Sequence, residues 1–404
     1  MNNPDAVVSS VADFVTEGHG DVVAALECGC YVEVELDEGR RARLDPADAR
    51  ARGLARVLMA ANRQHLLVYL ELDPETASIR RLRLPHVTHV TALGRGQDGG
   101  LEVRIAMSHA RHLLSRDQPG FAAIEATLRM ALDQGELVVL TEDDSHQIID
   151  VRPFQPGPEV PQPPLPPELP PPTLPRVSWG RRLWRGLWSW WGFGCVSAAR
   201  AQQVLDAMRA PGCDPLTAPA PCVPFLYPDD GCWARAHEMC RLMQDMKLSP
   251  RKVWIQGRLT AATHNHPDCR VPWTWHVAPT LAVRWLWLFR RTSIIDPALF
   301  TEPVSRTVWK AALGDAAATL TDSDASIYYL WGSVTDPGYI QTNQYLSFYR
   351  LQLQTRVVER GLPPYAQCPR QAGEIGAGRR RLDARTAVAD ATVGIHPHEQ
   401  LPLS

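Results

Sequence analysis

The sequence lacks the features that mark three broad classes of protein. No stretch approaches the ~20 apolar residues that a transmembrane helix needs, and the nearest candidate, WLWLF at 285–289, lies between two arginines. The 42 Lys and Arg residues nearly balance the 44 Asp and Glu residues, so the charge predicts no general attraction to nucleic acid or to an acidic membrane. The first thirty residues show no basic segment followed by an apolar one, so we expect no conventional signal peptide.

Cysteine is also scarce, with nine residues in a chain of 404 and no CxxC pair. This excludes a disulfide scaffold and gives no sign of a zinc ribbon or a thioredoxin-like site. The odd number leaves at least one cysteine unpaired. Cys213 and Cys222 enclose the short loop DPLTAPAP and could be bridged in an oxidising compartment, and the sequence leaves their redox state open.

Proline, in contrast, is concentrated in PFQPGPEVPQPPLPPELPPPTLP at 153–175. Proline lacks a backbone donor and has a fixed φ, so this stretch predicts a semi-rigid spacer between two halves of the chain. The division that follows is a β-rich module (1–97), a small α+β module (98–152), a linker (153–176), a second large domain (177–360) and a flexible tail (361–404).

Alternating apolar and polar residues predict strands in both halves. In the first half the predicted strands are 31–36, 65–72 and 86–93, with helices at 108–116 and 120–134. In the second half a helix at 198–210 precedes strands at 251–259, 273–283, 292–300 and 345–357. A helix followed by a series of antiparallel strands is typical of the α+β class.

The segment WGRRLWRGLWSWWGFG at 179–194 places leucines and tryptophans on one helical face and arginines on the other. Such a helix could lie on a membrane or a partner protein. Because the segment is short and carries several glycines, we favour packing of its aromatic face on the catalytic core.

The motif DDGCWARAHEM at 229–239 has the signals of a helix start directly before Cys232. A thiol is a useful nucleophile as the thiolate, which unpaired N–H groups and the helix dipole favour at a helix N-terminus. Asp229 or Asp230 could cap this helix, Gly231 permits a tight turn, and free N–H groups could contribute to an oxyanion hole.

Two downstream residues could complete a catalytic group with this thiol. His276 lies in the predicted strand WTWHVAP, and Asp296 ends the β-branched run SIIDP. Neighbouring antiparallel strands could bring the imidazole and the carboxylate together. Each residue alone is more often a core cysteine, a packed histidine or a turn residue, but their order and setting favour catalysis.

These motifs resemble those of the bacterial protein-glutamine glutaminases. The family pattern Y-P-x-D-G-C-Y-A-R-A-H, then W-S-Y-H-V-A, then I-I-D-P-S-L-F is matched by YPDDGCWARAH, WTWHVAP and IIDPALF, within residues 198–357. The resemblance implies a transglutaminase-like or papain-like cysteine-hydrolase fold, in which a helix bearing the cysteine packs on an antiparallel sheet bearing the histidine and the aspartate.

Carried over by position, the resemblance implies Cys232 as nucleophile, His276 as general base and Asp296 as the orienting acid. It implies that Asp230 and Gly231 form the helix cap and oxyanion region. An aromatic wall for the substrate is expected from Trp233, Trp273 and Trp275, of which the first and third stand where the family has Tyr. Cys213 and Cys222 match a cysteine pair of the family.

The implied reaction is deamidation of glutamine side chains on protein substrates through a Cys thioester, without a metal or an organic cofactor. The alternatives are a transglutaminase or a cysteine protease that uses the same three residues, and a silent binding protein that kept the fold. Four further residues, His237, His264, His266 and Cys269, include metal-ligating types, but their spacing fits no common zinc pattern. We expect Arg235 and Glu238 to fix the helix and not to touch the substrate.

The role of the first half stays open between an inhibitory pro-region and a delivery or targeting module. We expect a protein that is made in the cytoplasm and either retained there or exported as an effector toxin. The expected partners are proteins with accessible glutamines, and also a secretion machinery or a cognate inhibitor. We expect no nucleic acid, and membrane contact only through 179–194.

Overall fold

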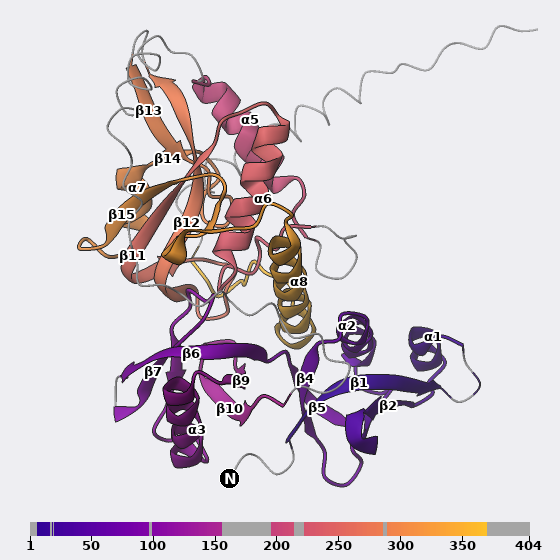
Figure 1. The fold of residues 1–404 in the computed structure, drawn as a ribbon. Helices are drawn as coiled ribbons and strands as arrows, with labels where there is room; N and C mark the ends of the chain where they lie inside the picture. The colour runs from indigo at the N-terminus through magenta and orange to yellow at the C-terminus, as the bar shows by residue number, and fades with distance from the viewer. Residues whose placement is uncertain are drawn as a thin grey trace, which may run out of the picture.

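The computed structural model of the chain describes residues 6–16, 18, 20–96, 99–155, 195–213, 222–285 and 289–369. These residues form three five-stranded antiparallel sheets and a two-stranded one, combined with helices, which confirms the α+β class. Figure 1 shows two sheets side by side in the first half of the chain and the third sheet in the second half. Within the described residues, no helix is long and apolar enough to cross a membrane.

Three predicted segments fall wholly or largely outside the described residues. They are most of the proline-rich linker, the aromatic segment 179–194 and the part of the tail from residue 370 onward.

The first half consists of two units with the same topology, three strands followed by a helix and two strands. The first unit contains β1 Ala6–Thr16, β2 Val32–Leu36, β3 Arg41–Leu44, α2 Ala51–Arg63, β4 Leu67–Leu72 and β5 Ile79–Arg83, with α1 Val22–Glu27 and η1 Asp37–Gly39 between its strands. The second contains β6 His86–Arg95, β7 Leu101–Ile105, β8 His112–Leu114, α3 Phe121–Gln134, β9 Leu137–Glu142 and β10 Ile148–Pro153. Their sheet orders, β3-β2-β1-β4-β5 and β8-β7-β6-β9-β10, correspond strand for strand.

The two units differ in the connection between their second and third strands. In the first unit, residues 37–40 form a short turn between β2 and β3. In the second unit, the equivalent connection between β7 and β8 is the longer segment 106–111, which leaves the sheet and enters the second half of the molecule. We call residues 106–111 the plug loop.

The structure corrects three expectations for this half. The predicted helix at 108–116 is wrong, because these residues form part of the plug loop and then β8, which pairs with β7. The module boundary lies near residue 85 and not at 97, because β6 pairs with β7 and β9 of the second sheet. The helix α2 was missed, although Leu54, Leu58 and Ala61 bury one helical face.

In the second half, helices cover the third sheet. Its elements are α5 Ala198–Arg209, α6 Cys232–Asp245, β11 Arg251–Ala262, β12 Arg270–Trp285, β13 Phe289–Ile294, β14 Val304–Ser305, α7 Arg306–Ala312, β15 Thr319–Asp324, β16 Ile327–Tyr329, η3 Trp331–Ser333, β17 Val334–Thr335 and α8 Ile340–Arg360. The sheet order is β14-β13-β12-β11-β15, and α6 packs on β12, the central strand.

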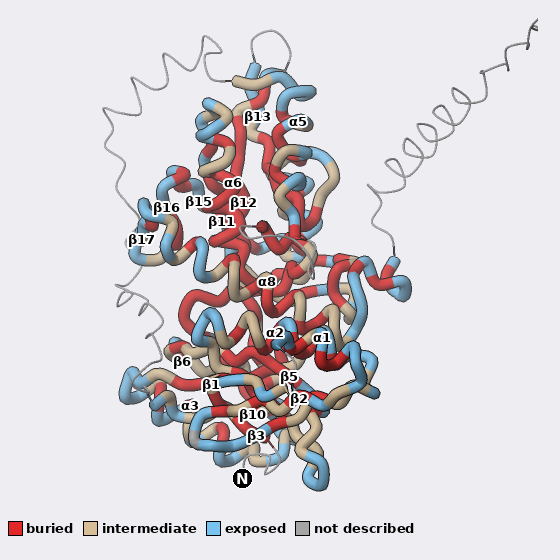
Figure 2. Tube along the Cα trace, turned by 90° about the vertical axis from the view of Figure 1, so that its right-hand side faces the viewer, coloured by how far each residue is buried: buried red, intermediate tan, exposed pale blue. Residues whose placement is uncertain are grey.

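The predicted final strand at 345–357 is wrong, because these residues belong to the helix α8. Two opposite faces of α8 are buried. Leu346, Tyr349 and Leu353 enter the core of the second half, while Leu351 enters the core of the first unit. The two apolar faces together produce a strand-like alternation in the sequence, and Figure 2 shows α8 buried between the halves.

The end of the described chain also packs on the second half. Cys269 and Cys368 form a disulfide, and the Tyr365 N–H donates to the His264 carbonyl. The expectation of a flexible tail therefore fails for residues 361–369. A second disulfide joins Cys213 and Cys222, the pair that the sequence left open.

The close approach of α2 and α8 gives a test of how the halves are joined. A Cβ added at Gly53 would lie 2.5 Å from the Val358 Cγ2. Overpacking costs about 1–3 kcal/mol, while alanine gains roughly 1 kcal/mol over glycine in a helix. We therefore expect Gly53→Ala to lower the free energy of unfolding in the wild-type chain and to raise it in a Val358→Ala background. Urea unfolding of the four chains measures this coupling, and identical effects in both backgrounds would contradict it.

Candidate active site

Cys232 is the first residue of α6, at the end of that helix that points toward the first half. Gly231 precedes it with φ 79°, and a Cβ at this position would lie 2.4 Å from the Tyr349 ring. Only glycine therefore fits the turn. The N-cap residue is Gly231 and no side chain caps the helix, so the expectation that Asp229 or Asp230 caps it is wrong.

The imidazole of His276 and the carboxylate of Asp296 lie together, as the sequence predicted. His276 is on β12 and Asp296 follows β13, the neighbouring strand. The His276 Nε2 lies 2.9 Å from the Asp296 Oδ2, and the Trp309 indole N–H donates to the same oxygen at 2.9 Å. Trp309 lies in α7, and sequence reasoning gave it no role.

The sulfur of Cys232 faces this pair. The sulfur, one ring nitrogen of His276 and one ring nitrogen of His109 all lie within 4.8 Å of one another. The three side chains are 1%, 2% and 0% exposed. The structure thus brings together the three predicted residues and adds His109, which comes from the plug loop and which no motif in the sequence indicated.

The plug loop is held along β12 as a short extended segment. Ala110 forms an antiparallel bridge with Trp273, and the Thr274 N–H donates to the His109 carbonyl at 2.8 Å. The Arg111 N–H donates to the Pro272 carbonyl at 3.4 Å. Because β13 pairs with β12 only from Thr280 onward, the plug loop uses the free edge of β12 beside His276.

Asp230 fastens the plug loop to α6 and α8. Its Oδ1 accepts from the N–H groups of His109 (3.1 Å) and Gly231 (2.9 Å). Its Oδ2 accepts from the Ser108 hydroxyl (2.6 Å) and the Tyr349 hydroxyl (2.9 Å). The role of Asp230 is thus to join the two halves and not to cap the helix.

Asp229 forms a second buried anchor. Both of its oxygens accept from the Arg356 guanidinium, at 2.7 and 2.8 Å, and Oδ1 lies 3.1 Å from the His266 Nε2. Burial raises the pKa of the Asp229 carboxyl, but Arg356 and His266 outweigh burial and hold it below its usual range. Asp229 is therefore charged in the fold and binds α8 to the loop before α6.

The three tryptophans predicted to line the substrate site are buried in the structure. The Trp273 ring stacks on His276, with centroids 4.5 Å apart and an interplanar angle of 13°, and its N–H donates to the Asp229 carbonyl. The Trp233 N–H donates to the Tyr328 hydroxyl, and Trp275 packs against Trp233 and Trp254. With the plug loop in place, a substrate contact for these three residues stays a prediction.

Burial governs the electrostatics of the thiol. It raises the pKa of Cys232 well above the ordinary value, and the Arg235 charge, which acts in the opposite direction, does not cancel this effect. Burial likewise lowers the pKa of His109 well below its ordinary value. In this conformation the thiol is protonated at neutral pH and His109 is neutral.

The four further residues of metal-ligating types that the sequence offered do not form a common site. His237 lies 2.9 Å from the Lys252 ammonium, His266 contacts the Asp144 carbonyl and Asp229, and Cys269 is in a disulfide. Arg235 donates to the carbonyls of Tyr227 and Asp230, and Glu238 pairs with Arg241. Arg235 and Glu238 thus contact other parts of the protein, as expected for structural residues.

Behind the plug loop lies a buried cluster around Glu142 on β9. Glu142 accepts from His112 at 2.5 Å and from His146 at 2.8 Å. The other ring nitrogen of His112 lies 2.9 Å from the Ser108 hydroxyl, which reaches Asp230. The cluster supports the plug loop from the side of the first half.

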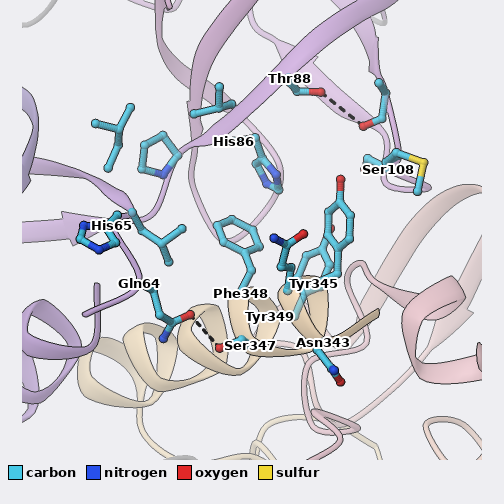
Figure 3. A pocket seen from close by; sticks show the side chains of 17 residues that line it. Gln64, His65, His86, Thr88, Ser108, Asn343, Tyr345, Ser347, Phe348 and Tyr349 are labelled. Carbon is cyan, nitrogen blue, oxygen red and sulfur yellow. Dashed lines mark hydrogen bonds between the residues drawn. The ribbon is translucent and has the colours of Figure 1, made fainter. Parts of the chain in front are cut away.

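A cavity of about 450 Å³ lies beside the plug loop, between β6 and α8. Figure 3 shows Tyr345, Phe348 and Tyr349 of α8 facing His86 across it, with Ser108 at its edge. The cavity does not include Cys232, His276 or Asp296 among its lining residues. It is thus separate from the thiol.

Comparison with known proteins finds a family model that matches part of the second half. Residues 199–313 match the family model Gln_deamidase_2, described as glutaminase, and no curated protein matches the chain. A mutant of pro-protein-glutaminase is 21% identical over 71% of this chain and 100% of its own, with a TM-score of 0.45. A structure of protein-glutaminase is 26% identical over 44% of this chain and 99% of its own, with a TM-score of 0.34. The structure of protein-glutaminase from Chryseobacterium proteolyticum is 26% identical over 44% of this chain and 95% of its own, with a TM-score of 0.35.

The TM-scores are below 0.5, so the assignment depends on the family model together with the motifs. The chain carries a glutaminase domain on an α+β fold. The matched residues contain all three motifs that carry the resemblance to the protein-glutaminases, YPDDGCWARAH, WTWHVAP and IIDPALF, and the match supports a glutaminase activity for this domain.

From the cluster around Glu142 we expect the folded chain to lose stability at high pH. Burial lowers the pKa of His146, but Glu142 and Asp229 more than compensate and raise it to about 9, above the unfolded value of about 6.5. The stabilisation from protonated His146 is therefore complete below about pH 6.5 and is lost as the pH rises through about 9. The other titratable or charged groups around the cluster are His86, His112, Asp230, His266 and Arg356.

We expect the free energy of unfolding to fall on the order of 2–3 kcal/mol more in the wild-type chain than in His146→Asn between about pH 6 and pH 10. Asparagine is the suitable replacement because His146 has φ 58°, which asparagine tolerates. Urea unfolding across this range measures the difference. Parallel pH profiles for the two chains would show that His146 is not the titrating group.

Proposed function

We propose that the chain is a protein-glutamine deamidase in which Cys232, His276 and Asp296 act together and which the plug loop keeps inactive. The observation that supports this most is the shared geometry of the three groups. The sulfur lies at the start of a helix, one nitrogen of His276 is fixed by Asp296, and the remaining nitrogen, Nδ1, is buried without a hydrogen-bond partner beside the sulfur.

The reaction follows from this arrangement. His276 takes the proton of the Cys232 thiol, and the thiolate attacks the carbon of a glutamine γ-carboxamide, while backbone N–H groups at the start of α6 stabilise the oxyanion. His276 then gives its proton to the departing nitrogen, the C–N bond breaks, and ammonia leaves a thioester. Water, deprotonated by His276, attacks the thioester, and glutamate and the thiol are released.

Asp296 and Trp309 act on the reaction through His276. The carboxylate holds the Nε2 side of the ring, so that Nδ1 faces the sulfur, and the Trp309 N–H in turn orients the carboxylate. Trp273, stacked on the ring, limits its rotation and keeps water from one face. These contacts favour a single orientation of the imidazole.

The plug loop makes this arrangement latent. Its backbone occupies the free edge of β12 next to His276, where an extended polypeptide could pair in the same way, and His109 fills the space in front of the sulfur. Since Cys232 and His276 are almost fully buried, a glutamine side chain can reach the thiol only after the loop has moved.

Replacing residues 106–111 with a Gly/Ser segment of the same length, within the full chain, tests this proposal. We expect ammonia release from casein to rise at least about 10-fold over the unaltered chain, because displacement of the loop removes a competing intramolecular contact. The matched control is the same kind of replacement at residues 37–40, the equivalent turn of the first unit, which we expect to leave the rate unchanged.

The same incubation separates the competing activities. Ammonia without crosslinks supports deamidation, incorporation of an added amine supports a transglutaminase, and peptide-bond cleavage supports a cysteine protease. If the loop variant shows none of these and its Cys232 does not react with iodoacetamide, the chain is a silent binding protein. Equal rates for the variant and the unaltered chain would overturn the inhibitory role and favour a targeting role for the first half.

Asp296→Asn, made in the loop variant, tests the orienting role of the carboxylate. We expect kcat to fall about 10²- to 10⁴-fold with little change in KM, as for other carboxylates that orient a catalytic imidazole. Trp309→Phe retains the carboxylate and loses one hydrogen bond to it, so a smaller loss is expected. If Asp296→Asn raised KM alone, the carboxylate would act in substrate binding.

We further propose that the enzyme acts on proteins outside its producer as an exported effector. Latency supports this, since an enzyme that alters protein side chains endangers the cell in which it is made. Mass spectrometry of host proteins exposed to the loop variant or to the same chain with Cys232→Ala tests it. Glutamine-to-glutamate conversion that depends on Cys232 would identify the targets, and its absence from host proteins would refute the effector role.

A further inference from the structure

We propose that the latent chain binds one divalent transition-metal ion, with zinc as the best fit, between Cys232, His276 and His109. One ligand comes from the plug loop and two come from the second half of the chain. The ion is no cofactor of the deamidation. The ion binds the Cys232 sulfur while the plug loop is in place.

The donor set and its spacing fit zinc. Zinc prefers cysteine sulfur at about 2.3 Å and histidine nitrogen at about 2.0–2.1 Å in a tetrahedron, which places donor atoms roughly 3.5 Å apart. The three donor atoms already lie within 4.8 Å of one another. Small rotations of the side chains bring them to that spacing, and a water molecule or the Asp230 Oδ1, 3.3 Å from the His109 Nε2, can complete the coordination.

In the rings of His109 and His276, a hydrogen bond holds one nitrogen and leaves the other available to bind a metal ion. The His109 Nδ1 lies 2.9 Å from the Trp275 carbonyl, and the His276 Nε2 lies 2.9 Å from Asp296. Metal-binding histidines are usually held in this way, by a carbonyl or a carboxylate on the other nitrogen. The remaining His276 Nδ1 is buried without a hydrogen-bond partner, which is rare for buried polar atoms. The remaining His109 Nε2 forms no hydrogen bond, and its nearby charged group is the Asp230 carboxylate.

A second cluster of donor types serves as a comparison. His112, Glu142 and His146 also lie within 4.8 Å of one another. There, the donor atoms are already paired with one another, because both rings use Nδ1 to bond the carboxylate. In the group that contains the thiol, the His276 Nδ1 has no such hydrogen bond.

The site exists only while the two halves are docked. Movement of the plug loop removes His109 and leaves two protein ligands, so ion binding and docking stabilise each other. Bound zinc would therefore strengthen latency, and a chelating environment would weaken it. This inference concerns binding alone and does not require the chain to be a deamidase.

Titration of the full-length, chelator-treated chain with Co²⁺ tests the site, because thiolate-to-cobalt charge transfer reports sulfur ligation directly. We expect one equivalent to bind with this absorption band, and one equivalent of Zn²⁺ to remove it. Cys232→Ser should lose the band. His109→Asn should weaken binding at least about 10- to 100-fold, the loss that follows from removing even an outer-shell partner.

His65→Asn, which removes an exposed histidine of the first half, is the matched control and should bind as the unaltered chain does. Zn²⁺ should also raise the thermal unfolding midpoint of the unaltered chain and not that of Cys232→Ser, which keeps the test valid if His109→Asn fails to fold. Absence of the thiolate band, or equal affinity in His109→Asn, would overturn the proposal. If the unaltered chain shows the band but the loop variant deamidates no protein, only the proposed function is refuted.

Discussion

The buried carboxylate of Asp230 is the contact on which the rest of the arrangement depends. It accepts hydrogen bonds from the plug loop, from the turn before α6 and from α8. A buried carboxylate is tolerated only when such donors replace water. The same group therefore fixes the position of Cys232 and binds the segment that covers it, so the geometry of the site and its closure have a common origin.

The two halves are joined by more than the contacts of the plug loop. The helix α8 belongs to the second half in sequence, yet it buries Leu351 in the core of the first unit and pairs Arg356 with Asp229 on its other side. Arg83 of the first half also pairs with Glu359 of α8. Because the cores share a helix, displacement of the plug loop is a more local change than separation of the halves, and it leaves the apolar surface of α8 covered.

The plug loop shows how a repeated unit acquires a specific role. Both units of the first half follow one topology, and the connection between their second and third strands differs in length. In the first unit this connection is a short turn, and in the second it extends along β12. The sheets provide a rigid support, while a loop of a few residues provides the contact with the thiol.

The sequence by itself determined the resemblance to the glutaminases, the α+β class and the order of Cys232, His276 and Asp296, because these depend on local motifs and on strand periodicity. It could not determine the role of Asp230, since the donors to its carboxylate come from segments far away in the chain. The same reason explains the error at α8, where two buried faces imitate the alternation of a strand. His109 was decided by tertiary structure alone, because nothing in the local sequence specifies that a loop between two strands of one half will pair with the free edge of β12 in the other.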